Sequence, residues 1–465
     1  MFSLSNKYYY FIVLFYILYQ NVNYSSAATG PNHGKLVVCY IGTWAVYRPG
    51  QGSFSIEHLD PSMCTHVVYS FVGLNITHDG IRSLDPFQDL TEDYGKGGFN
   101  RVTSLRTRYP HLKVTVAIGG WNEGSTNYSQ LVADPARRGR FVANAVEFVR
   151  KHNFDGLDLD WEFPGKRGGD SRDKINFVLL VKELRNAFNK FNLLLTAAFG
   201  AGKDTIDVAY DVPNLSHYLD YVHLMCYDYH GAWDQKTGAN APLHANDVLS
   251  VEYSVKYMIE LGMDPSKLIM GLALYGRTFY LTEETLGSSQ QRPTLGALAK
   301  NVGFQGSFSR ENGFMGYNEI CLELKNTTSN WTKHWDETTQ TPFAINGDKV
   351  ITYDDERSIA EKVRFAIKQK LGGAMVWSID TDDFRGDCAI AEKEVGSDQR
   401  FNDNYPLMRT INEAIVKTLE ETEADKENEI PDEPNRTKDT DDKGSSSMLQ
   451  HSLLFVFVMP VIFLY

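Results

Sequence analysis

The sequence lacks an excess of positive charge, long apolar runs and abundant cysteine. Its 465 residues carry a net charge of −13, which argues against nucleic acid as a partner. A helix needs about 20 apolar residues to cross a bilayer, and the apolar runs at the two ends, 10–19 and 453–465, are shorter. The five cysteines are few, but they are compatible with an oxidising compartment. The chain is therefore expected to be a globular protein without a long membrane-spanning helix.

The N-terminal 28 residues have the order of a signal peptide. Lys7 precedes the apolar run 10–19, and the small residues Ser26, Ala27 and Ala28 follow it as a cleavage site. We expect residues 1–28 to be removed on entry into the secretory pathway; a membrane anchor is the alternative. Six glycosylation sequons agree with that route, at Asn75, Asn127, Asn214, Asn326, Asn330 and Asn435.

The C-terminal part changes composition twice. Residues 421–443 hold ten Asp or Glu against four Lys or Arg, which predicts a disordered acidic linker. Small residues at 444–447, a short spacer and the apolar run 453–465 then follow in the order of a GPI-attachment signal. We expect a lipid near Ser445 that holds the protein on the outer face of the plasma membrane. A short transmembrane tail and a plainly secreted form are the alternatives.

Between these ends, apolar strand-like segments alternate with helical patterns. The expected strands are 35–44, 66–74, 112–120, 154–165, 193–199, 221–228, 268–275 and 373–379, and the expected helices include 138–151, 175–191, 248–261 and 357–371. This alternation predicts an α/β fold, a (β/α)8 TIM barrel. A doubly wound open sheet is the alternative, but no glycine-rich phosphate turn follows the first strand. About 80 residues before the helix near 357 are too many for a loop.

One strand carries an unusual acidic face. The segment 154–165 reads FDGLDLDWEFPG, in which Asp158, Asp160 and Glu162 alternate with two leucines and a tryptophan. This is the period-two pattern of a strand, so the three acids share one face. An acidic face in a strand that helices cover on both sides indicates a catalytic centre or a metal cage.

The spacing of the acids favours catalysis. Side chains two positions apart on a strand lie about 6–7 Å apart, and at an effective dielectric of about 20 two charges at that distance repel by roughly 2.5 kcal/mol. Three neighbouring carboxylates would hardly all stay ionised, so Glu162 is expected to hold a proton near neutral pH, as a general acid must. A solvated acidic edge strand or a calcium site is the alternative, but neither needs the large apolar residues on the other face.

The motif D-x-x-D-x-D-x-E, formed by Asp155, Asp158, Asp160 and Glu162, resembles the signature of family 18 glycoside hydrolases, the chitinases. The resemblance covers about residues 35 to 418. It implies endo-acting hydrolysis of β-1,4 linkages between N-acetylglucosamine units, with chitin and chito-oligosaccharides as partners and neither metal nor cofactor. It also implies that about 278–352 form a small α+β insertion domain, one wall of a deep groove.

The resemblance assigns roles to four residues. Glu162 would protonate the glycosidic oxygen, while the nucleophile would be the substrate's own acetamido carbonyl. Asp160 would orient that acetamido group, and Asp158 would share the charge or proton of Asp160. Tyr227, in the run MCYDYHG, would donate to the acetamido oxygen. Asp155 has the other strand parity and is therefore expected to be structural.

The carboxyl ends of the barrel strands carry many polar and aromatic residues, where the active site of such a barrel lies. Each ring alone is more often a packing residue, but several at one end favour a sugar-binding pocket. The resemblance places Trp377 as the floor under the sugar at the cleavage point. The complete expected substrate-binding set is Tyr40, Trp44, Phe71, Trp121, Met225, Asp228, Trp233, Tyr275, Arg277, Tyr353 and Trp377.

The family's usual pairing implies the disulfides Cys39–Cys64 and Cys321–Cys388, with Cys226 left as a buried free thiol, although sequence alone does not fix the connectivity. The resemblance also implies a preference for soluble or amorphous chains, because no cysteine-rich chitin-binding module follows residue 420. A monomer is expected.

Two other functions remain open on the same fold. A chitin-binding lectin of this family usually lacks the terminal acid of the motif, whereas Glu162 is present here. An endo-β-N-acetylglucosaminidase that acts on N-glycans would use the same chemistry. The long insertion and Tyr353 favour a deep groove for a linear polymer instead.

Overall fold

The computed structural model describes residues 29–287, 294–390 and 404–428. The expected signal peptide, Asn435 and the expected GPI-attachment signal lie outside these ranges. Contacts divide the chain into two compact units, residues 1–422 and 423–465. The barrel, its insertion and the site described below all belong to the first unit.

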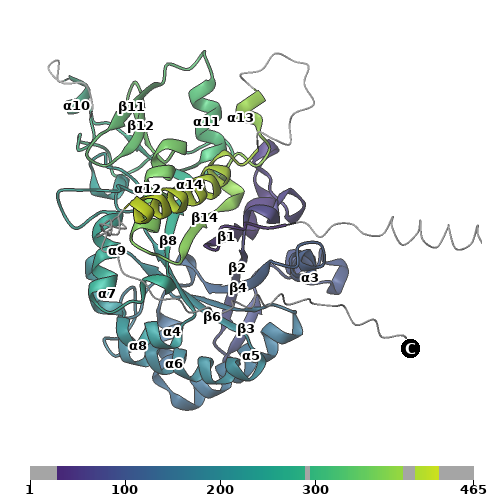
Figure 1. The fold of residues 1–465 in the computed structure, drawn as a ribbon. Helices are drawn as coiled ribbons and strands as arrows, with labels where there is room; N and C mark the ends of the chain where they lie inside the picture. The colour runs from purple at the N-terminus through teal and green to yellow at the C-terminus, as the bar shows by residue number, and fades with distance from the viewer. Residues whose placement is uncertain (1–28, 288–293, 391–403, 429–465) are drawn as a thin grey trace, which may run out of the picture. The chain divides into compact units, whose positions relative to one another are not determined.

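Eight parallel strands close into a barrel (Figure 1). They are β1 (Leu36–Gly42), β2 (His66–Asn75), β4 (Lys113–Gly119), β5 (Gly156–Asp160), β6 (Leu194–Gly200), β7 (Tyr221–Met225), β8 (Leu268–Ala273) and β14 (Gly373–Trp377). Closure comes from β1, which pairs in parallel with both β2 and β14. The predicted TIM barrel is confirmed, and all eight strands fall within or next to the expected segments.

Helices cover the outside of the barrel (Figure 1). Those expected from the sequence are α5 (Pro135–Lys151), α6 (Asp173–Phe188), α9 (Val251–Glu260) and α12 (Glu356–Lys368). Capping residues set the starts of α5 and α12: the Asp134 carboxylate accepts from the Ala136 amide at 2.7 Å, and Asp355 accepts from the Ser358 amide at 2.9 Å. This cap explains why α5 begins three residues before the expected 138.

The sequence pattern did not reveal several shorter elements. These are α2 (Pro86–Asp89), α3 (Gly98–Ser104), α4 (Thr126–Ala133), α7 (Lys203–Ala209), α8 (Val212–Tyr218), α10 (Glu283–Gly287), α13 (Asp387–Ile390) and the strand β3 (Gly80–Ser83), which pairs antiparallel with β2. The long helix α14 (Pro406–Asn428) was also not expected. It continues into the segment 421–443 for which the sequence predicts a linker, so the linker cannot begin at 421.

The two faces of β5 separate as its alternation predicts. Leu157, Leu159 and Trp161 are buried on the outer face, where the Trp161 ring contacts Phe177 of α6 at 5.8 Å. The acids therefore face the interior of the barrel. Asp155, of the other parity, accepts from the Val114 amide at 2.7 Å and has a structural role.

The insertion between β8 and α12 is a five-stranded antiparallel sheet with the order β10-β9-β13-β12-β11. Its strands are β9 (Tyr275–Tyr280), β10 (Phe314–Gly316), β11 (Thr332–Asp336), β12 (Thr341–Asn346) and β13 (Lys349–Thr352), with α11 (Tyr317–Lys325) packed beside them. The α+β insertion is thus present where the long gap predicts it. Its first strand begins at Tyr275, slightly before the expected 278.

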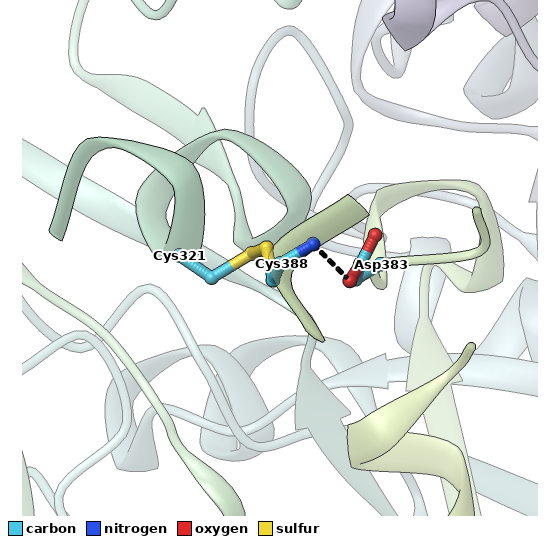
Figure 2. Close-up of side chains that lie close together, drawn as sticks. All are labelled: Cys321, Asp383 and Cys388. Carbon is cyan, nitrogen blue, oxygen red and sulfur yellow. Dashed lines mark hydrogen bonds between the residues drawn. A yellow bond between two sulfur atoms is a disulfide. The ribbon is translucent and has the colours of Figure 1, made fainter. Parts of the chain in front are cut away.

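Two disulfides join neighbouring elements, Cys39–Cys64 and Cys321–Cys388, as the family pairing implies. Figure 2 shows the second bond, between α11 and α13, with the Asp383 carboxylate accepting from the Cys388 amide at 2.9 Å. These three side chains have the spacing of metal ligands, but the two sulfurs are bonded to each other and offer no thiolate. Cys226 is a buried free thiol, and burial raises its pKa to about 12, which makes it unreactive.

None of the helices within the described ranges is long and apolar enough to cross a membrane.

Candidate active site

Asp158 lies at the centre of the barrel and is completely buried. Its Oδ2 accepts from the Tyr40 hydroxyl of β1 at 2.6 Å, and its Oδ1 accepts from the Thr196 hydroxyl of β6 at 2.6 Å. The Nδ1 atom of His223, on β7, lies 3.1 Å from the same Oδ1. Four barrel strands therefore fix this carboxylate. Thr196 and His223 were not in the predicted site, although Thr196 stands directly beside Asp158 in the strand register.

Asp160 lies one step further along the same interior face. It is buried, and its Oδ1 has no hydrogen-bond partner among the described residues. Burial raises its pKa well above the ordinary carboxyl value, and the charges of Glu162 and Asp158 raise it further. A buried polar oxygen without a protein partner is rare, and one that faces the mouth of a barrel is suited to accept a ligand N–H.

Glu162 follows the end of β5 and is half-buried. Burial, and then the charge of Asp228, raise its pKa to about 7, while Arg167 opposes that rise. The predicted proton near neutral pH is thus supported, although its leading cause is burial rather than repulsion from the neighbouring acids. Because the pKa is raised, the acid form is present below about pH 7 and is lost as the pH rises through that value.

Tyr227 and Asp228 follow β7 directly. Burial keeps the pKa of the Tyr227 hydroxyl well above its usual value, so this group stays a hydrogen-bond donor. Asp228 has a φ of 59°, in the left-handed region that non-glycine residues rarely adopt and that often marks functional positions. Its amide donates to the Asn240 side chain at 3.0 Å, which stabilises this conformation. Asn240 was missed because nothing in its local sequence marks it.

Asp228 also joins the barrel to the insertion. Its Oδ1 accepts from the Tyr275 hydroxyl at 2.6 Å and from the Arg277 Nε at 2.7 Å, both on β9. Three predicted substrate-binding residues therefore meet in one hydrogen-bonded group at the edge of the site. The Arg277 guanidinium lies 5.1 Å from the ring of Trp233, which brings a fourth predicted residue beside them.

The rings at the ends of β1, β2 and β14 form one cluster, in which Trp44 also lies 6.0 Å from Trp377. Trp377 lies 5.7 Å from Phe71, nearly parallel to it, and Phe71 in turn stacks on Trp44 at 6.1 Å. Tyr40 contacts Trp377 edge-on at 5.8 Å. Met225 packs against this cluster from the end of β7. Within this cluster Tyr40 is buried, whereas Trp44 is 44% exposed.

Two further tryptophans offer open ring faces. Trp121, after β4, is 59% exposed, and Trp233 is 54% exposed. Exposed indole rings that lie beside buried acids suit the apolar faces of sugar rings. The fold therefore gathers ten of the eleven predicted substrate-binding residues with the four predicted catalytic ones.

Tyr353 is the exception, because the structure does not bring it together with the other ten. It is buried at the end of β13 and lines a separate cavity of about 380 Å³ with Tyr317, Asp355, Glu356 and the Cys321–Cys388 pair. Its Cβ lies close to the position that a side chain on Gly276 would take, so it packs beneath the insertion sheet. A tyrosine at the end of a strand does not reveal from sequence which side of the sheet it covers.

Comparison with known proteins gives consistent matches. Residues 36–382 match the model of the glycosyl hydrolases of family 18. The chain is 54% identical, over 87% of its own length and 87% of the relative, to a Drosophila melanogaster protein named probable chitinase 2. Its fold is similar to the solved Ostrinia furnacalis Group IV chitinase in complex with allosamidin, at 38% identity and a TM-score of 0.75, covering 83% of this chain and 99% of that one.

A third similar protein qualifies this picture. Human YKL-39, described as a pseudo-chitinase with retained chitooligosaccharide binding properties, is 33% identical with a TM-score of 0.71 and covers 82% of this chain and 100% of its own. Proteins of this fold thus include one that binds without catalysis. The decision between catalysis and binding therefore rests on the acids of this chain's own site.

Replacing Asp228 with Asn should lower the pKa of Glu162, because the substitution removes the carboxylate charge that opposes its ionisation. Asn tolerates the left-handed backbone of this position. The pKa is measurable by carbon-13 NMR titration of labelled glutamate carboxyls, with Glu162→Gln identifying the signal. As a control, Asp170→Asn removes an exposed carboxylate paired with Arg172 and should leave the signal unchanged. An unchanged or higher Glu162 pKa in Asp228→Asn contradicts these electrostatics.

Proposed function

Because the chain belongs to the glycosyl hydrolases of family 18, we propose that it is an endo-acting chitinase that cleaves β-1,4 linkages between N-acetylglucosamine units. The observation that carries this proposal is Glu162, a half-buried acid whose pKa is raised to about 7. Beside it lie Asp160, with its unpartnered oxygen, and a cluster of rings suited to sugar faces. The names of the similar Drosophila and Ostrinia proteins support the same substrate class.

In this reaction Glu162 donates its proton to the glycosidic oxygen as the bond breaks. The substrate's acetamido carbonyl attacks the anomeric carbon, so that no protein carboxylate needs to act as the nucleophile. The Asp160 Oδ1 accepts the acetamido N–H and orients the carbonyl, while the Tyr227 hydroxyl donates to the carbonyl oxygen. Water then opens the cyclic intermediate, and Glu162 takes back a proton from that water.

Asp158 supports Asp160 from below. Two hydroxyls, of Tyr40 and Thr196, donate to its carboxylate, so both of its oxygens are hydrogen-bonded by protein inside the barrel. When Asp160 must give up its proton to accept the acetamido N–H, Asp158 is the adjacent carboxylate on the same strand that can share it. We assign Asp158, Asp160, Glu162 and Tyr227 to catalysis on these contacts.

A lectin function on the same fold is disfavoured by Glu162 itself. A binding protein has no need for a proton-holding acid beside the unpartnered Asp160 oxygen. For an endo-β-N-acetylglucosaminidase, Tyr353 gives no argument either way, because it is buried at the end of β13. The remaining argument for a linear polymer is the long insertion between β8 and α12.

The stereochemistry of the first product tests the proposal. Proton NMR of fresh chitohexaose digests should show the β-anomer of the new reducing end first, because substrate-assisted catalysis retains configuration. Internal cleavage should produce oligomers of intermediate length from the first minutes. An α-anomer as the initial product would rule out the assigned mechanism, and release of monosaccharide alone would rule out endo action.

Replacing Glu162 with Gln should lower kcat by at least about 10²-fold, because it removes the general acid while keeping the side-chain shape. Binding of chito-oligosaccharides, followed by tryptophan fluorescence, should persist. Glu260→Gln, at an exposed glutamate on α9, serves as the matched control and should behave as wild type. Asp160→Asn should cost a comparable factor through lost acetamido orientation. Near-wild-type turnover by Glu162→Gln would show that another group donates the proton.

We further propose that the protein works as a monomer outside the cell, held by a lipid. The two disulfides fit an oxidising compartment. Of the sequons, Asn127, Asn214, Asn326 and Asn330 are exposed, and Asn75 is half-buried with its side chain accepting from the His78 amide. Four sites are therefore accessible to a glycosyl transferase in the folded chain. The ordered small residues, spacer and apolar tail after 443 support the GPI anchor.

Phosphatidylinositol-specific phospholipase C should release active enzyme from cells that express the full chain, because that enzyme cleaves the lipid of a GPI anchor. A chain truncated after Lys443 should appear in the medium without treatment. If activity stays on the cells after the phospholipase, while the truncated chain is free, the apolar tail itself is the anchor and the GPI assignment is wrong.

A further inference from the structure

Arg167 is a charged residue beside the general acid to which the proposed reaction assigns no role. It lies in the loop between β5 and α6, five positions after Glu162. Its φ is 51°, in the left-handed region that costs free energy for a residue with a side chain. The neighbouring Gly165 and Gly168 also have positive φ values, 74° and 93°. The chain thus adopts an unfavourable local conformation at this position.

The side chain of Arg167 makes two contacts. Its guanidinium carbon lies 3.5 Å from the centre of the Trp121 ring, and its Nη1 donates to the main-chain oxygen of Glu162 at 3.0 Å. The guanidinium therefore links an exposed indole ring to the backbone of the acid. Arginine is suited to this role because its plane stacks on a ring while its edge donates hydrogen bonds.

The loops that carry these residues are joined to each other. The Ser125 hydroxyl, four residues after Trp121, donates to the main-chain oxygen of Phe163 at 2.9 Å and accepts from the Trp161 indole at 2.9 Å. Lys166 pairs with Asp204 at 2.6 Å on the other side. The stacked arrangement of Arg167 on Trp121 is therefore built on a fixed base.

Stacking alone does not indicate a function. Arg150 lies 4.1 Å over the ring of Phe191, and Arg357 lies 3.6 Å over Trp335. Neither of these arginines is among the charges that act on Glu162, whereas Arg167 is. The groups that face Glu162 are Asp160 from β5, Asp228 and Tyr227 after β7, Tyr210 after α7, and Arg167. Arg167 supplies positive charge to this otherwise acidic and phenolic group.

The position of the Trp121 ring under the Arg167 guanidinium indicates which part of the substrate the ring could contact. Trp377, in its cluster with Trp44 and Phe71, is the proposed floor of the sugar at the cleavage point. The Phe71 ring of this cluster lies against Gly120, the residue before Trp121. A general acid must lie beside the leaving oxygen. An indole ring fixed to the backbone of that acid, and offering an open face, is placed to carry the sugar that departs.

We propose that Arg167 is a positioning residue, which holds the Trp121 ring as the platform for the departing sugar and places a fixed positive charge beside Glu162. This inference rests on the proposed chitinase activity. It adds a specificity element, since substrates with a sugar as leaving group use the platform and substrates with a small aryl leaving group do not.

The test compares two substrates and three variants. The leaving group of chitotetraose is a sugar, whereas the leaving group of 4-nitrophenyl chitobioside is nitrophenolate. Arg167→Ala should raise KM for chitotetraose by about three- to fivefold, the typical worth of an exposed cation–ring contact, and leave KM for the nitrophenyl substrate unchanged. It should also move the alkaline limb of the kcat/KM profile to higher pH, because loss of a positive charge raises the pKa of the Glu162 carboxyl.

Arg167→Lys separates the two effects. It keeps the charge, so the alkaline limb should stay at its wild-type position, but it lacks the planar face, so KM for chitotetraose should still rise. Arg172→Ala, which removes an exposed arginine paired with Asp170 in the same loop, should match wild type in both measurements. Thermal unfolding of each variant reports any loss of folding.

Two outcomes overturn the proposal. One is an Arg167→Ala variant that matches Arg172→Ala on both substrates and in the pH profile. The other is an equal rise in KM for both substrates with the alkaline limb unmoved in the folded protein, which indicates a general structural effect. A wild-type chain that hydrolyses neither substrate contradicts the proposed function instead, and is distinguishable from failure at Arg167.

Discussion

The site depends on three acids on the inner face of a closed barrel, of which Asp158 and Asp160 are buried and Glu162 is half-buried. The apolar outer face of β5 packs under the helices, and this fixes the inner face on which Asp158, Asp160 and Glu162 stand. Water is largely excluded there, so the charged forms of Asp160 and Glu162 are disfavoured and both pKa values rise. The packing that stabilises the strand therefore also raises the pKa values of these acids.

Hydrogen bonds from other strands offset the free-energy cost of burying these carboxylates. Asp158 is buried, which is tolerable because Tyr40 and Thr196 donate to its oxygens and His223 lies beside it. Asp228, which is more exposed, is stabilised by Tyr275 and by the cation of Arg277, both in the insertion. The insertion is thus tied to the electrostatics of the barrel, since the charge of Asp228 acts on Glu162.

Much of this was predictable from sequence because the decisive pattern is local. The alternation in 154–165 gave the orientation of the acids and the structural role of Asp155. Thr196, His223 and Asn240 were not predictable, because their importance comes from contacts between strands far apart in sequence. From sequence, the raised pKa of Glu162 was attributed to its nearest acidic neighbours. Its larger causes, burial and the charge of Asp228, arise only when the barrel closes. The acidic composition after 421 hid a helix that continues to Asn428.

The two raised pKa values have opposite consequences for a substrate. Glu162 must be protonated to act, and burial serves that need directly. Asp160 must accept an N–H, which requires it to lose the proton that burial favours. Bringing an acetamido N–H to the unpartnered Oδ1 supplies the missing hydrogen bond and stabilises the ionised form, so the substrate itself drives the change. A sugar without that group leaves Asp160 protonated and without its partner, so selectivity for N-acetylated chains follows from the same burial that prepares the acid.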